Sequence, residues 1–289
     1  MKRVVVDLNT MEKISPAFRG ARGHWLAKKA INLFAIDKVN KVYESSCDHS
    51  GADFAASLLN DLGVFYKVGD ADRLKHLPEG AFITISNHPY GGLDGIMLID
   101  LMAGIRPDYK LMVNSVLSLI ETMRENFISV KPVGNKKNAN VSNVRGVRTT
   151  LSHLQEGHPM GFFPSGAVSN FIVKDMRLKD REWQESVLRL IQGAKVPIVP
   201  IRFLDRNSTF FYFLGLISWR VRSLRMPYEV FNKGKQNPRI AIGNILTLEE
   251  QEQFADVKSF GKYLRKSIYE MPKPASYTPR IIPNLKGKK

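Results

Sequence analysis

One short stretch combines the side chains needed for proton transfer with a flexible backbone. It runs from Ser86 to Gly95 and reads Ser-Asn-His-Pro-Tyr-Gly-Gly-Leu-Asp-Gly. A loop histidine can act as a general base near neutral pH, and a nearby carboxylate fixes its tautomer and stabilises the imidazolium. His88 is therefore the candidate catalytic base and Asp94 its partner. In a competing interpretation the stretch is only a glycine-rich turn whose histidine hydrogen-bonds the backbone.

The elements on either side of this stretch favour a functional loop. The apolar residues 81–85 predict a buried strand, and residues 96–102 predict a helix. Loops between strands and helices are where α/β proteins usually display functional groups. The glycines allow unusual backbone angles and close approach of a ligand. We therefore expect Asn87, Gly91 and Gly92 to contact the substrate.

Short apolar runs alternate with helical patterns over residues 66–262. Strands are expected at 110–113, 127–130, 160–163 and 196–201, and helices at 141–156 and 182–192, the latter two closed by Gly157 and Gly193. This alternation predicts an α/β domain whose central sheet, largely parallel or mixed, is flanked by helices.

The two ends of the chain differ from this domain. Residues 1–65 predict an N-terminal helical segment, with apolar residues at helical spacing among many basic ones: Leu26, Ala30, Leu33 and Phe34. Such a helix either rests on an anionic membrane or packs its apolar stripe on the core, and both interpretations stay open. Residues 263–289 are expected to form a basic, proline-containing C-terminal tail, and its stretch 271–289, with four prolines and a basic end, predicts an extended or disordered arm.

The charge of the chain limits its partners. Lys and Arg total 43 against 27 Asp and Glu, which gives +16 and an isoelectric point near 9.9. Such an excess favours an anionic membrane surface, an acidic carrier protein or nucleic acid. The sequence has no zinc-finger spacing or RNA-binding motif, so nucleic acid is not expected, although a non-catalytic basic binding protein stays open. The single cysteine, Cys47, predicts neither a disulfide nor a metal site, and we expect no cofactor.

No secretory signal or transmembrane helix is expected from the sequence. The most apolar stretch, residues 210–219, is about half the length that a spanning helix needs, and arginines follow it at 220, 222 and 225. Aromatic rings followed by cations suit a membrane interface. Packing in the protein core is the alternative, and the sequence does not decide between them.

The loop motif resembles the signature of the glycerolipid acyltransferase superfamily, which includes the lysophosphatidic acid acyltransferases. That signature usually leaves four residues between His and Asp, whereas five separate His88 from Asp94 here. This variant is similar to the hemolysin-like acyltransferase branch, which includes lyso-ornithine lipid and lyso-glycine lipid O-acyltransferases. The resemblance covers roughly residues 60–250 and includes further blocks: FFPSGAVS at 162–169, KDREWQ at 179–184, VPIVPIRF at 196–203 and RNS at 206–208.

The resemblance implies transfer of a fatty acyl group from a thioester to the hydroxyl of a lysolipid. Relatives that form phosphatidic acid have Phe-Pro-Glu-Gly-Thr-Arg where this chain has Phe-Pro-Ser-Gly-Ala-Val at 163–168. Losing the arginine removes a phosphate ligand. We therefore expect a lyso-amino-acid lipid acceptor, with lysophosphatidic acid as the alternative unless another basic residue binds the phosphate. Further substrate-binding positions implied by the aligned blocks are Lys131, Ser165, Gly166 and Asn207, although Asn207 can instead shape a turn.

The resemblance and the basic charge together predict the donor and the location. An acidic acyl carrier protein is the preferred thioester donor, with acyl-CoA as the alternative. Backbone N–H groups of the oxyanion site are expected either at Gly91–Gly92 or near Gly166. The protein is expected to be peripheral, at the cytoplasmic face of a bacterial inner membrane.

Overall fold

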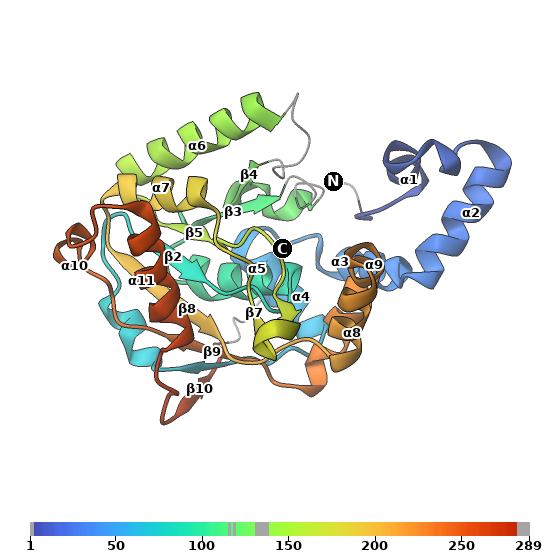
Figure 1. Cartoon of the computed structure of the whole chain (residues 1–289). Helices are drawn as coiled ribbons and strands as arrows, with labels where there is room; N and C mark the ends of the chain where they lie inside the picture. The colour runs from blue at the N-terminus through green and yellow to red at the C-terminus, as the bar shows by residue number, and fades with distance from the viewer. Residues whose placement is uncertain (1–2, 115–116, 118–119, 131–138, 282–289) are drawn as a thin grey trace.

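The computed structural model describes residues 3–281 apart from 115–116, 118–119 and 131–138. Its helices and strands follow one another as mapped in Figure 1: α1 (Leu8–Ile14), α2 (Gly20–Leu33), α3 (Ile36–Ser46), α4 (Gly51–Asp61), β1 (Lys67–Gly69), β2 (Ile83–Ser86), α5 (Gly92–Leu98), β3 (Lys110–Asn114), β4 (Phe127–Val130), α6 (Ala139–Gln155), β5 (Met160–Phe162), β6 (Asn170–Ile172), β7 (Arg177–Lys179), α7 (Glu185–Ala194), β8 (Ile198–Phe203), α8 (Thr209–Ile217), α9 (Trp219–Phe231), β9 (Arg239–Ile242), α10 (Leu248–Glu252), α11 (Val257–Tyr269) and β10 (Tyr277–Pro279). A π-helical turn, η3 (Ile99–Ala103), extends α5.

The described strands form a large mixed sheet in the order β10-β1-β9-β8-β2-β5-β3-β4. Neighbouring strands are parallel except for β1–β10 and β8–β9. A second, antiparallel pair joins β6 and β7. The predicted α/β class with a largely parallel or mixed sheet is therefore confirmed. The strands expected at 110–113, 127–130 and 160–163 lie within one residue of β3, β4 and β5.

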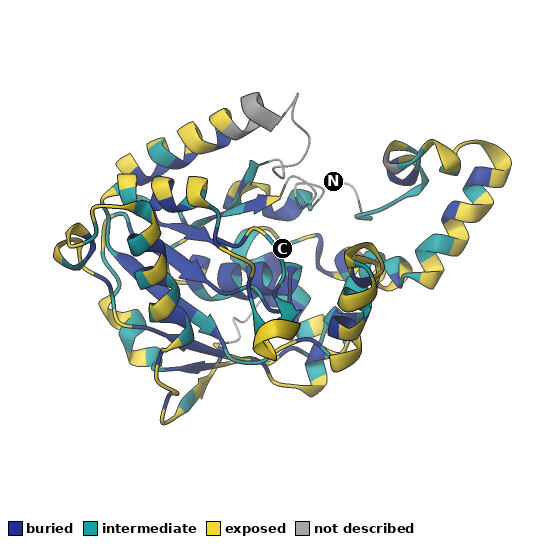
Figure 2. Cartoon of the chain, viewed as in Figure 1, coloured by how far each residue is buried: buried dark blue, intermediate teal, exposed yellow. Residues whose placement is uncertain are grey.

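Helices cover both faces of the sheet, as buried strands of this kind require. One core places α4, α5 and η3 against the sheet and includes Phe54, Met97 and Ile201. The other core places α7 and α11 on the opposite face and includes Ile191 and Phe260. Figure 2 shows the strands between these layers as almost entirely buried.

The apolar stripe predicted on the N-terminal helix does not pack on the core. Leu26 and Leu33 of α2 are exposed, and the buried residues of this helix are Gly23 and Ala27. The core-packing interpretation therefore fails for Leu26 and Leu33, whereas Ala30 and Phe34 are half-buried. Gly23 lies directly against the backbone of Phe18, where a larger side chain would not fit.

The C-terminal segment is not an extended arm over the residues that the structure describes. The expected boundary at residue 262 falls inside α11, and β10 pairs with β1. Arg280 then enters the core, where its guanidinium donates to the carbonyls of Val64 and Ala56 and lies 3.6 Å from the Asp100 carboxylate. Composition alone missed this anchor because prolines and basic residues are also common in disordered chain.

Replacing Arg280 with alanine is expected to destabilise the fold by about 3–5 kcal/mol, because it leaves the buried Asp100 carboxylate without its cation. Urea unfolding followed by circular dichroism measures this change. Lys273→Ala removes an exposed cation from the same segment and is expected to stay within about 0.5 kcal/mol of the wild type. Equal stability of the two variants would contradict the anchoring role.

Candidate active site

The His88 loop leaves the sheet at its centre. All four residues of β2 are buried, and the chain then passes through His88 into α5. Gly91 caps α5 with φ of +83°, a backbone conformation that favours glycine. Asp94 stands in the first turn of the helix, so its carboxylate faces back toward the loop.

His88 and Asp94 meet as the sequence pattern requires. The Nδ1 atom of His88 lies 2.9 Å from Oδ2 of Asp94, and the histidine side chain is 17% exposed while the aspartate is fully buried. The same Oδ2 accepts hydrogen bonds from the backbone N–H groups of Tyr90 (2.9 Å) and Gly91 (3.0 Å). The positive φ of Gly91 lets the loop turn tightly enough to place both N–H groups on the carboxylate. The five-residue spacing between His88 and Asp94 is therefore compatible with contact.

Burial determines the protonation behaviour of this carboxylate. Loss of water raises the pKa of Asp94, while the contact with His88 and the two backbone hydrogen bonds act in the opposite direction. Because Nδ1 of His88 faces Asp94, Nε2 on the other side of the ring is the nitrogen available to a substrate hydroxyl. The pair can thus accept a proton at Nε2 and stabilise the resulting imidazolium through Nδ1.

The two neighbouring glycines of the loop have different surroundings. A Cβ added at Gly91 would lie 2.9 Å from Sδ of Met226, whereas a Cβ at Gly92 meets no atom within 4 Å. Gly91→Ala is therefore expected to lower both thermal stability and turnover, because the strained φ costs about 1–3 kcal/mol and moves the N–H groups off Asp94. Gly92→Ala is expected to unfold at the wild-type temperature. Thermal unfolding of both variants, with an acyl-transfer assay, checks this contrast, and equal melting temperatures would contradict it.

Asn87 and Asn207, which were predicted to contact the substrate, make hydrogen bonds within the protein. The amide of Asn87 donates to the carbonyl of Phe203 and accepts from its N–H, at 2.9 and 2.8 Å. The amide of Asn207 donates to the carbonyl of Pro89 at 3.0 Å. Both side chains are buried. The two asparagines therefore hold the His88 loop to the end of β8, which agrees with the turn interpretation of Asn207.

The loop after β5 forms one wall of the site. Phe163 stacks on the His88 ring, with the centroids 4.2 Å apart. Ser165 donates to the carbonyl of Ala167, and Gly166 adopts φ of +61° where a Cβ would overlap Gln184. The side chain of Val168 lies against Gly91. Ser165 and Gly166 thus shape this loop, while Phe163 and Val168 give it an apolar surface.

The backbone hydrogen bonds narrow the choice of an oxyanion donor. The Gly91 N–H is used by Asp94, and the Gly166 N–H donates to the carbonyl of Phe163 at 2.9 Å. The N–H of Gly92 makes no hydrogen bond with any described residue, as is usual in the first turn of a helix. Among the predicted donors, Gly92 is therefore the one that remains open to a ligand.

Asp180 is a residue of the site that was not predicted from the sequence pattern. This residue is fully buried, and its Oδ1 accepts from the backbone N–H of His88 at 3.2 Å and from the Ser169 hydroxyl at 2.5 Å. Ser169 in turn donates its N–H to the carbonyl of His88. Asp180 therefore positions the His88 loop. In the sequence, Asp180 lies in the KDREWQ block that resembles the acyltransferase superfamily. That resemblance did not indicate which residue Asp180 contacts.

A second missed group supports the loop from the other side. The ammonium group of Lys233 is fully buried, lies 3.2 Å from the Glu229 carboxylate and stands over the Tyr90 ring at 5.3 Å. Burial lowers the pKa of Lys233, and Glu229 opposes that shift. Glu229 also accepts from the hydroxyl and N–H of Ser208. This pair ties α9 to the segment that holds Pro89 in place.

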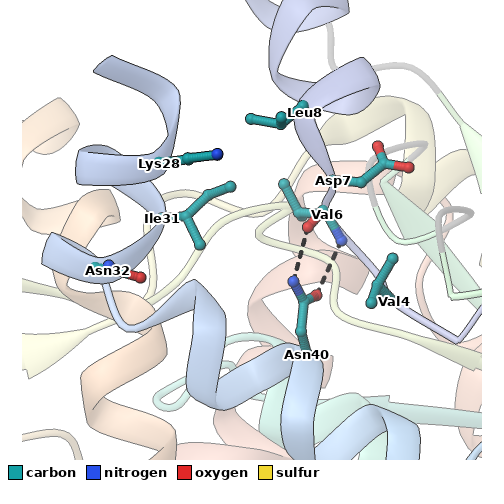
Figure 3. A pocket seen from close by; sticks show the side chains of 8 residues that line it. All are labelled: Val4, Val6, Asp7, Leu8, Lys28, Ile31, Asn32 and Asn40. Carbon is teal, nitrogen blue, oxygen red and sulfur yellow. Dashed lines mark hydrogen bonds between the residues drawn. The ribbon is translucent and has the colours of Figure 1, made fainter. Parts of the chain in front are cut away.

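The remaining predicted residue, Lys131, lies outside the described residues. A hollow of about 440 Å³ opens in the N-terminal segment, and Figure 3 shows Asn40 hydrogen-bonded to Val6 at its wall. Its lining includes Lys28 and Ile31 but no residue of the His88 loop. It is therefore separate from His88 and Asp94.

The chain is similar to several known proteins. The chain is 24% identical over 81% of its length, and 85% of the relative, to the lyso-glycine lipid O-acyltransferase of Bacteroides thetaiotaomicron. The corresponding enzyme of Phocaeicola vulgatus is 22% identical over 86% of this chain and 85% of its own. A crystal structure of the 1-acyl-sn-glycerophosphate acyltransferase PlsC from Thermotoga maritima aligns at 13% identity and a TM-score of 0.48, covering 85% of this chain and 86% of that one. The family model described as "Acyltransferase" matches residues 12–275, and with this match over most of its length the chain belongs to that acyltransferase family.

Proposed function

We propose that the protein transfers a fatty acyl group from a thioester to the hydroxyl of a lysolipid, most suitably a lyso-glycine or lyso-ornithine lipid. The observation that carries this proposal is the 2.9 Å contact between His88 and a buried Asp94, in a loop that solvent reaches. The relatives named lyso-glycine lipid O-acyltransferases support the acceptor class.

The reaction needs one proton acceptor and one site for negative charge. Nε2 of His88 takes the hydroxyl proton as the hydroxyl oxygen attacks the thioester carbonyl carbon. Asp94 stabilises the imidazolium through Nδ1. The tetrahedral oxyanion forms near the open N–H of Gly92. Collapse of that intermediate breaks the carbon–sulfur bond, and the thiolate receives the proton from His88, so no covalent enzyme intermediate is required.

The wall beside the loop supports an acceptor without a phosphate at this position. Val168 occupies the place of the arginine found in relatives that form phosphatidic acid, and it contacts Gly91. An apolar side chain there offers no bidentate partner to a phosphate. Lysophosphatidic acid is the second candidate acceptor, favoured if a basic residue elsewhere, such as Lys131 or Lys174, binds the phosphate.

The donor and the location follow from charge. An acidic acyl carrier protein suits a chain of net charge +16, and acyl-CoA is the alternative. We expect the enzyme to act as a peripheral protein at an anionic membrane, at the cytoplasmic face of a bacterial inner membrane, and without a cofactor. Among the described residues, no helix has the length and apolar character needed to cross a bilayer.

A direct assay tests both substrates. Purified protein is incubated with a radiolabelled fatty acyl group bound as a thioester to acyl carrier protein or to CoA. The acceptor is lyso-glycine lipid, lyso-ornithine lipid or lysophosphatidic acid. Acylation of an amino-acid lysolipid with the carrier protein as the better donor is the expected result. Exclusive use of lysophosphatidic acid would overturn the acceptor, and preference for acyl-CoA at low salt would overturn the donor. No transfer to any acceptor would overturn the function.

A further inference from the structure

Helices α8 and α9 present an apolar surface to solvent. Ile217 is 66% exposed and Trp219 is 60% exposed at the junction of the two helices. Both helices begin with a capping serine, Ser208 and Ser218, so they are well-formed elements. We call the surface the α8–α9 face and define it by its exposed apolar residues: Phe210, Phe213, Leu216, Ile217, Trp219, Val221 and Leu224.

The opposite side of the same helices already packs against the active site. Phe211 and Tyr212 are buried, and the Tyr212 hydroxyl donates to the carbonyl of Pro89. Arg222 donates to the carbonyl of Ser169, and Met226 contacts the position of Gly91. The inner side of α8 and α9 is therefore packed against the protein, whereas the outer side of these helices has no partner among the described residues. A group of large exposed apolar side chains on two helices in contact is a candidate interaction site.

The charges around this face identify its partner. The segment 206–228 contains no acidic residue and four arginines, of which Arg222 is buried on the inner side. Arg220 lies over the Trp219 ring at 5.4 Å, and Arg225 lies over the Phe210 ring at 5.4 Å. The first acidic residue that follows, Glu229, is buried and paired with Lys233. Aromatic rings with guanidinium groups beside them suit the boundary between acyl chains and anionic head groups.

We propose that the α8–α9 face docks on an anionic lipid bilayer. The inference deepens the proposed function and rests on it for the identity of the substrate. Because Tyr212 and Met226 connect this face directly to the His88 loop, docking would bring the loop to head-group depth. A lysolipid could then present its hydroxyl to His88 while its acyl chain stays close to the bilayer.

Vesicle co-sedimentation of the full chain tests the docking. The double variant Phe213→Ser with Ile217→Ser removes two exposed apolar side chains one turn apart, and Leu248→Ser is the control on α10, where Leu248 is also exposed. On vesicles of phosphatidylethanolamine and phosphatidylglycerol, the double variant is expected to bind at least about tenfold more weakly than wild type. The control is expected to bind like wild type. Wild-type binding by the double variant would overturn the proposal.

Tryptophan quenching shows which element touches lipid. Trp219 reports on the α8–α9 face in a Trp25→Phe protein, Trp25 reports on α2 in a Trp219→Phe protein, and the third tryptophan, Trp183, is buried in both. Lipids with brominated acyl chains are expected to quench Trp219 on docking. Quenching of Trp25 without quenching of Trp219 would overturn the proposal in favour of α2.

Two further measurements separate this proposal from its alternatives. With a water-soluble short-chain lysolipid, the double variant is expected to keep wild-type turnover while losing turnover on bilayer-embedded acceptor. Wild-type protein that binds vesicles but acylates no acceptor would overturn the proposed function and leave the docking intact. Sedimentation velocity without lipid tests a second copy as the occupant, and a dimer that the double variant abolishes would overturn the bilayer proposal.

Discussion

Replacing His88 with alanine is expected to lower kcat/KM for acyl transfer by at least about 10³-fold, within the range that general-base catalysis contributes. The imidazole is the group in the loop that can take the hydroxyl proton, and methyl cannot replace it. The fold is expected to persist, because the hydrogen bonds of His88 to Asp180 and Ser169 use its backbone. A radiolabelled acyl-transfer assay, with circular dichroism to confirm folding, measures the effect.

A matched control comes from the other close histidine–aspartate pair among the described residues. Nδ1 of His158 lies 2.8 Å from Oδ2 of Asp108, at a distance close to that of the catalytic pair. His158→Ala removes a similar contact outside the His88 loop and is expected to keep wild-type kcat/KM. Substantial turnover by the His88 variant would remove His88 as the base, and equal losses in both variants would indicate a general structural effect.

Asp94→Asn is expected to lower kcat by about 10²- to 10⁴-fold, with a smaller change in KM. An amide oxygen can still accept from Tyr90 and Gly91, so the loop keeps its shape. The amide lacks the negative charge that stabilises the imidazolium, and the rate of proton transfer falls. Steady-state kinetics separate the two parameters. Nearly full activity would mean that the contact seen at 2.9 Å has no part in catalysis.

The same variant is expected to be as stable as wild type at neutral pH, or more stable. Burial raises the pKa of Asp94, so folding favours the neutral carboxyl, and the stability that this contributes is lost as the pH rises from the unfolded pKa through the folded one. Asparagine is neutral throughout. Any advantage of the variant in thermal unfolding should therefore be largest at neutral pH and vanish below about pH 3.9.

Asp108 serves as a control because its pKa is shifted in the opposite direction to that of Asp94. Partial burial raises its pKa, but hydrogen bonds from Arg106 and His158 hold the pKa of Asp108 at about 2. Its ionised form therefore stabilises the fold above the unfolded pKa, and this stability is lost as the pH falls toward 2. Asp108→Asn is expected to lower thermal stability at neutral pH without changing kcat. If Asp94→Asn lost as much stability as Asp108→Asn, the upward direction of the Asp94 pKa shift would be contradicted.

The features that could be predicted from sequence are local ones. Strands such as residues 127–130 are short apolar runs bounded by polar residues, so their position follows from the pattern. The pairing of His88 with Asp94 is also local, because it needs only a strand, a glycine at positive φ and the first turn of a helix. The alternative interpretation was a glycine-rich turn whose histidine hydrogen-bonds only the backbone. The 2.9 Å contact of His88 with the fully buried Asp94 disfavours that interpretation.

The features that could not be predicted depend on residues far apart in the chain. The hydrogen bonds between Asn87 and Phe203 join positions 116 residues apart, and those of Asp180 to His88 join positions 92 apart. An asparagine or aspartate beside a catalytic residue reads equally well as a ligand contact or as a structural one. The exposure of the α8–α9 face could not be predicted from the sequence either, because a buried helix and a lipid-facing helix have the same apolar composition.

The anchoring of Asp100 by Arg280 has a consequence for synthesis of the protein. At ribosomal rates of about 5–20 residues per second, roughly 10–40 s separate the translation of these two residues. During that interval the nascent chain lacks the cation that its central acidic group requires, and β1 lacks the neighbouring strand β10. Products of premature termination would therefore be weakly folded and readily degraded, which would keep incompletely made enzyme away from the lipid surface.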